Sequence, residues 1–113
     1  MSETYQPTGK TTLSPDVLLT IAKMAALSVE GVARLAPVPG GFGRFFRRGA
    51  NEGVQIKVED GLVYLDLFVI LQKDVNVRDA SRNIQQQVAR AIEEMVGMDI
   101  GHVNIHVEDI DYV

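Results

Sequence analysis

One short segment of the chain interleaves aromatic rings with guanidinium groups. The segment Phe42–Arg48 reads Phe-Gly-Arg-Phe-Phe-Arg-Arg. Phenylalanine can enter the acyl boundary of a bilayer while arginine binds lipid phosphate, and the same two groups can hold phosphates and stack on bases. The alternative is that the rings pack under the sheet and the arginines are solvated. The residues predicted to contact a partner or lipid are Phe42, Arg44, Phe45, Phe46, Arg47 and Arg48.

Side chains that could support catalysis or hold a metal ion are few. His102 and His106 are the only histidines, and on an extended strand their spacing puts them ~13 Å apart, too far to share an ion. The sequence contains no Walker-type phosphate loop, no Gly-x-Ser-x-Gly and no paired-histidine helix motif. We therefore expect no catalytic residues, no metal site and no cofactor, and a protein that is not an enzyme.

The length and composition of the chain indicate the number of domains, the compartment and the kind of partner. The 113 residues suffice for one hydrophobic core. We expect a flexible N-terminal tail over residues 1–8 and a single domain over residues 9–113. The chain has no cysteine, which favours the cytosol, and its net charge of −4 disfavours a whole-surface affinity for nucleic acid.

Two helices are predicted from capping residues and helical periodicity. Ser14-Pro15-Asp16 is typical of a helix start, and Gly31 is the expected end of the first helix. Asn76 is the expected cap of a second helix over Val77–Val96, which Gly97 closes. The predicted buried stripes are Val17, Leu18, Ile21, Met24 and Ala25 in the first helix, and Val77, Ala80, Ile84, Val88, Ala91 and Met95 in the second.

Two β-branched threonines favour a short strand over Gly9–Leu13, and alternation of apolar and polar residues predicts a strand over Val54–Glu59. The apolar run Leu62–Gln72 is predicted as the next strand, and alternation from Val103 to Glu108 predicts the last. The dipeptide Asp60-Gly61 suits a tight hairpin turn, so the second and third of these strands should pair antiparallel. The order is β-α-β-β-α-β. This order favours an α+β fold, with two helices packed on one face of a small, mostly antiparallel sheet. Residues 37–51, rich in proline and glycine, are expected to form a mobile loop.

The strand Leu62–Gln72 is apolar on both of its faces. Its even-numbered positions place Tyr64, Phe68 and Ile70 on the sheet face away from the predicted helices. An exposed apolar stripe needs covering, so we predict these three residues as a protein contact. The alternatives are a homo-oligomer, the N-terminal tail, or simple cross-strand packing.

Three stretches of the chain together resemble the bacterial alkaline-shock, or Gls-type general stress, protein family. They are Gly9–Ala33, Val63–Val69 and Val75–Met95. The closing Val103-Asn-Ile-His-Val107 is similar to the last strand of that family. The resemblance implies a cytoplasmic, non-enzymatic protein of the envelope stress response, recruited to the inner face of the membrane through partner proteins. It supplies no catalytic residues.

The sequence therefore favours an adaptor or structural component near the cytoplasmic side of the cell envelope. Its expected partner is a membrane-anchored or other envelope-associated protein, with a homo-oligomer and direct contact with anionic lipid as further options. The alternative function is an RNA-binding domain that uses the basic loop and the open sheet face. Against it, the basic-Gly-aromatic motif of such sheets is missing, and Asp66 would lie against phosphate.

Overall fold

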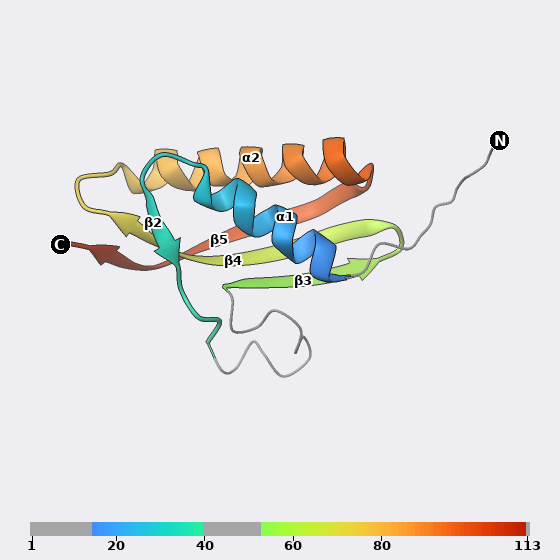
Figure 1. Ribbon diagram of the computed structural model, residues 1–113, viewed down its shortest axis with the longest axis horizontal. Coiled ribbons are helices and arrows are strands. Elements are labelled where there is room, and N and C mark those ends of the chain that lie inside the picture. Colours follow the sequence, from blue (N-terminus) through green and yellow to red (C-terminus); the bar gives the residue numbers. More distant parts are fainter. Residues whose placement is uncertain (1–14, 40–52, 113) are drawn as a thin grey trace.

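The computed structural model describes residues 15–39 and 53–112. The predicted N-terminal tail, the predicted strand Gly9–Leu13 and most of the predicted loop 37–51 lie outside the described residues. The described elements follow the order α1 (Pro15–Leu27), β2 (Val32–Leu35), β3 (Val54–Glu59), β4 (Leu62–Gln72), α2 (Val77–Val96) and β5 (Asp99–Asp111). The chain thus has an α+β fold, in which two helices lie on the same side of a sheet (Figure 1).

The capping residues define α2 as predicted. The Oδ1 atom of Asn76 accepts a hydrogen bond from the Asp79 backbone N–H at 3.0 Å, and Gly97 closes the helix with a left-handed φ of 79°. The helix α1 begins at Pro15 but ends at Leu27, before the expected Gly31. Gly31 instead adopts a φ of 100° in the turn that enters β2, and its carbonyl accepts a bond from Gln72 N–H at 2.8 Å.

The strand β4 is the centre of the sheet. Along one edge it pairs antiparallel with β3 and then, further on, with β2. Along the other edge it pairs parallel with β5 over its whole length. The strand β2 was not predicted, because four residues between a turn and a proline-rich segment carry little periodic signal. The strand β4 is paired along both edges, and Ala36 and Val38 pack on Phe68, which accounts for much of the apolar character of its second face.

The hairpin between β3 and β4 turns at Asp60 and Gly61, as predicted. Both residues adopt positive φ angles, 55° and 79°, which a two-residue turn of this kind requires. The resulting register pairs Val58 with Val63 and Gln55 with Asp66. The hairpin therefore fixes which residues of β4 face the helices.

The core lies between the sheet and the two helices. The β4 residues Val63, Leu65, Leu67, Val69 and Leu71 are fully buried there. They pack with residues that recur every fourth position on α2, namely Ala80, Ile84, Val88 and Ile92. On α1 they pack with Leu18, Leu19, Ala22 and Ala26.

Four residues expected in the buried stripes are exposed instead. Val17 and Met24 of α1 are 41% and 64% exposed, because α1 is apolar on nearly all sides and its periodicity does not decide which side faces the sheet. Val77 and Met95 of α2 are 43% and 69% exposed. Along α2 the buried positions recur every four residues from Ala80 to Ile92, and the half-buried Val96 continues this row, so Met95 lies beside it. Val77 lies in the first turn, before the first buried position.

Candidate functional site

The candidate site is the sheet face opposite the helices. The alternation of β4 places Tyr64, Asp66, Phe68 and Ile70 on this open face, and the parallel register sets His102, Asn104 and His106 of β5 beside the first three. The predicted assignment of Tyr64, Phe68 and Ile70 to one face follows from that alternation. The structure adds the β5 residues, which form a second row.

Two ring pairs bind the rows together. Tyr64 meets His102 edge to face, with ring centroids 5.0 Å apart at 66°. Phe68 stacks on His106, with centroids 4.5 Å apart at 12°. Both separations fall in the range of favourable aromatic contacts, which add about 0.5–1.5 kcal/mol beyond area burial for aromatic pairs. The histidines therefore hold the two rings in place.

The ring of Tyr64 also lies directly over the backbone of Gly101. A Cβ atom at position 101 would meet Cε1 of the ring and lie only 2.7 Å from Cδ1 and from Cζ, closer than any real contact allows. The sheet register shifts at this point, between Val63 and Tyr64. The ring above position 101 therefore favours glycine there.

A polar cluster separates the two ring pairs. Oδ1 of Asp66 lies 2.9 Å from Nε2 of His106 and 3.3 Å from Nδ2 of Asn104. Because a carboxylate oxygen only accepts, Nε2 of His106 must carry the proton in this contact. The side chains of His106 and Asp66 are 34% and 26% exposed, so solvent reaches this contact, and the hydrogen bond orients both groups.

Two cationic side chains beside this face, Arg34 and Lys57, each form an ion pair with a carboxylate. Arg34 of β2 contacts Asp111 of β5 at 2.8 Å and so joins the two strands that flank β4. Lys57 contacts Glu59 on β3 at 3.0 Å. These cations are therefore engaged by carboxylates, and a phosphate group would have to compete for them.

Phe68 differs from its neighbours in being enclosed. It is 1% exposed and packs with Ala36, Val38 and Ile70. Its backbone carbonyl accepts from Ala36 N–H at 2.8 Å, and its N–H donates to the Gly53 carbonyl at 2.9 Å. Ala36 and Val38, together with the His106 ring on the neighbouring strand, thus enclose Phe68, so the expectation of an exposed ring at this position is wrong. Tyr64 and Ile70 are half-buried and remain accessible.

The other predicted contact residues belong to the segment Phe42–Arg48. Phe42, Arg44, Phe45, Phe46, Arg47 and Arg48 lie outside the described residues. The two chain segments that flank them do converge, because Ala36 and Gly53 both bond to the backbone of Phe68. Ala36 and Gly53, which lie on either side of that segment in the sequence, are therefore both positioned beside Phe68.

Reasoning from the sequence missed the β5 row. It treated His102 and His106 as a failed metal pair, whereas the structure sets each against a different aromatic ring. The available signal was their even spacing with Asn104, which matches the spacing of Tyr64, Asp66 and Phe68.

Within residues 15–39 and 53–112, no group of three or more potential ligands could hold a metal ion. Neither of the two described helices has the length and apolarity needed to cross a bilayer.

The fold and this face define a small two-layer α+β domain whose open sheet face carries fixed rings and hydrogen-bonding groups. Residues 3–112 match the family model of the alkaline-shock proteins, whose description reads "cell envelope-related function". The chain belongs to this family, which confirms the resemblance stated from the sequence.

Relatives with a similar sequence cover most of the chain. It is 39% identical to the Streptococcus pyogenes protein Spy1535 over 103 residues, which span 90% of this chain and 79% of the relative. It is 26% identical to the Bacillus subtilis protein YqhY over 106 residues, spanning 92% of this chain and 78% of the relative.

Solved structures with a similar fold include "MamM-CTD 215-293", with a TM-score of 0.52 and 13% sequence identity. The match covers 83% of this chain and 96% of that chain. A single-residue variant of the same domain gives a TM-score of 0.55 at 12% identity and covers 87% of this chain and all of that one. At this level of identity the likeness concerns the fold alone.

Proposed function

We propose that this protein is a non-enzymatic adaptor or structural component of the cell envelope machinery, and that it binds a protein partner through the open sheet face. The observation that carries the proposal is the fixed double row on that face. Its rings and polar groups are held by described neighbours, as in the Tyr64–His102 pair and the Asp66–His106 bond. A surface fixed in this way loses little conformational entropy when a partner binds.

The part of the face nearest Tyr64 is the proposed contact. Phe68 is enclosed by the chain itself, whereas Tyr64 is half-buried and His102 is exposed. Tyrosine supplies a large apolar surface with a polar end, the combination typical of residues that dominate protein interfaces. The cell envelope-related description of the family supports a partner at or near the membrane.

The experiment is a crosslinking capture from the native cell that compares the wild type with Tyr64→Lys. Tyr64→Lys places a charge in the proposed contact but leaves the buried Phe68 intact. The matched control is Gln86→Lys, which introduces the same charge at an exposed position on α2. We expect an envelope-associated partner to be recovered with the wild type and Gln86→Lys, and lost with Tyr64→Lys. Recovery of the same partners with all three proteins would remove the sheet face from the proposal.

Direct lipid contact by the segment Phe42–Arg48 stays a separate prediction. It rests on composition, because rings and guanidiniums together suit an anionic bilayer surface. Sedimentation with liposomes, with and without anionic lipid, tests it by comparing the wild type with Phe45→Ala/Phe46→Ala and with Arg47→Glu/Arg48→Glu. If the wild type does not sediment with anionic liposomes, the lipid hypothesis is wrong and the protein partner remains.

No second function is proposed. An RNA-binding sheet needs free cations beside its stacking rings, because neutralising phosphates supplies most of the affinity. Here Arg34 and Lys57 are engaged by carboxylates, and Asp66 lies at the centre of the face. The described part of the sheet therefore offers no argument for nucleic acid.

A further inference from the structure

The outer side of the helix layer carries apolar side chains that the core does not use. Of the thirteen residues of α1, only Asp16, Thr20 and Lys23 after the initial proline are polar. One side of α1 packs on the sheet, while Val17, Met24 and Leu27 point outward and are 41%, 64% and 47% exposed. Asp16, Thr20 and Lys23 form the polar stripe of α1, and the three exposed apolar side chains beside it make this outer side a candidate for a contact.

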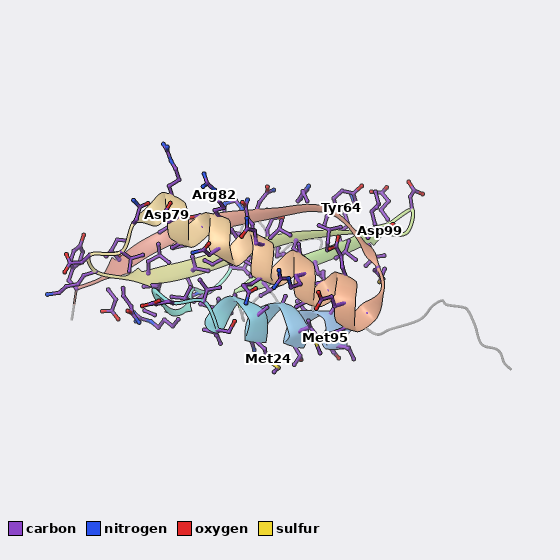
Figure 2. All side chains as sticks on the ribbon, turned by 90° about the horizontal axis from the view of Figure 1, so that it is seen from above. Met24, Tyr64, Asp79, Arg82, Met95 and Asp99 are labelled. Atoms are coloured by element: carbon purple, nitrogen blue, oxygen red, sulfur yellow. The ribbon has the colours of Figure 1, made fainter. Side chains whose placement is uncertain are left out.

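This outer side borders a groove between α1 and the C-terminal half of α2. The groove has a volume of about 380 Å³. The buried Ile21 and the half-buried Ala25 of α1 and Ala91 of α2 line it, together with the exposed Met24 and Met95. Figure 2 shows the two methionines next to each other at the outer surface of the two helices. We call this surface the methionine groove.

The methionine groove contains both the projections and the hollows that an interface between identical chains needs. Met24 and Met95 project, and the alanines between the helices leave room for a side chain to enter. In a two-fold interface the same patch meets itself, so each projection must find a hollow on an identical surface. Methionine is flexible and polarisable, so it adapts to a hollow of irregular shape.

The charges at the groove also fit an identical partner. Its charged lining residues are Arg90 and Glu94, one of each sign, and they lie 3.9 Å apart on α2. Two copies of a chain with a net charge of −4 repel each other in general. Contact through a locally neutral patch avoids that repulsion, whereas a strongly charged peptide or an anionic bilayer gains no attraction there.

We propose that a second copy of this chain docks on the methionine groove, around a two-fold axis near Met24, so that each Met24 enters the groove of the other protomer. The outer residues of α1 from Val17 to Leu27 extend the contact along the helix. This dimer uses the side of the molecule opposite the open sheet face. It is therefore independent of the proposed function, and the open face of each protomer stays available.

Sedimentation velocity of the full chain over a range of concentrations tests the dimer. We expect the wild type to dimerise and Met24→Glu/Met95→Glu to weaken dimerisation by about 100-fold or more, because the new carboxylates lose water without gaining partners. Both positions are exposed, so the monomer should keep its fold, which circular dichroism checks. The matched control is Val77→Glu, which changes an exposed apolar residue in the first turn of α2, away from the groove. It should dimerise like the wild type.

A second measurement uses the absence of cysteine from the sequence. Met24→Cys gives a chain with a single thiol, and a short bismaleimide should link two such chains across the axis. Val77→Cys, whose thiol lies away from the groove, should stay unlinked. A wild type that is monomeric at every concentration, a dimer that survives Met24→Glu/Met95→Glu, or equal crosslinking at both positions would each overturn the proposal.

Discussion

The contact between Tyr64 and Gly101 gives a test of the open face that depends on a single methyl group. Gly101→Ala adds a Cβ atom that would overlap Cε1 of Tyr64, with Cδ1 and Cζ both at 2.7 Å. The backbone of Gly101 is not among those with positive φ, so alanine meets no conformational barrier there. The entire cost of the substitution comes from the displaced ring.

The expected magnitude follows from two opposing effects. Overpacking of this kind costs about 1–3 kcal/mol, and replacing glycine by alanine at a compatible position stabilises by about 0.4–1 kcal/mol through the unfolded chain. We therefore expect Gly101→Ala to lower the free energy of unfolding by up to about 2.6 kcal/mol. In a Tyr64→Ser background the ring is gone, so the same substitution should stabilise by about 0.4–1 kcal/mol.

Urea denaturation of the wild type, the two single variants and the double variant measures this change of sign. The control is Gly61→Ala, where φ is 79° and no atom lies within 4 Å of the added Cβ. Its cost of about 1–2 kcal/mol is a backbone effect and should be the same with and without Tyr64. If Gly101→Ala has an equal effect in both backgrounds, the ring does not lie over Gly101 and the described open face is wrong.

Three further substitutions test other parts of the structure by urea denaturation. Phe68→Ala should lower the free energy of unfolding by about 3–5 kcal/mol, because the ring is fully enclosed, and a loss below about 1 kcal/mol would mean that it is exposed in solution. Asn76→Ala removes the side-chain acceptor for Asp79 N–H and should cost about 0.5–2 kcal/mol, whereas an unchanged stability would show that the cap does not form. Met95→Ala should change the stability of the monomer by no more than about 0.5 kcal/mol, and a larger loss would place this residue in the core.

The elements with strong local signals could be predicted from the sequence. The helix α2 has the bounds that Asn76 and Gly97 indicate, and the hairpin turns at Asp60-Gly61. In both cases one residue type satisfies a local backbone requirement, so no knowledge of the tertiary structure is needed. The strand β2 lacks such a signal, since it is recognisable as a strand only through its pairing with β4.

The face of α1 and the candidate site could not be derived in the same way. The helix α1 is apolar on nearly every side, so its sequence allowed Met24 in the core as readily as Leu19. The polar and aromatic row on the open face depends on the parallel register of β4 and β5, which a twenty-residue helix separates in the chain. Parallel pairing across such a crossover leaves no trace in either strand alone.

The two faces of β4 show how the accessible part of the sheet is limited. On the helix side every odd-numbered residue from Val63 to Leu71 is fully buried. On the open side the C-terminal half of β4 is covered at Phe68 by Ala36, Val38 and the His106 ring, and it is closed beyond Ile70 by the Arg34–Asp111 pair. Apart from the half-buried Ile70, the accessible rings of this face therefore lie in the N-terminal half, where Tyr64 and His102 meet above Gly101. A partner of the open face must bind next to the β3–β4 hairpin, and substitutions at Tyr64 and His102 should weaken its binding more than any at Ile70.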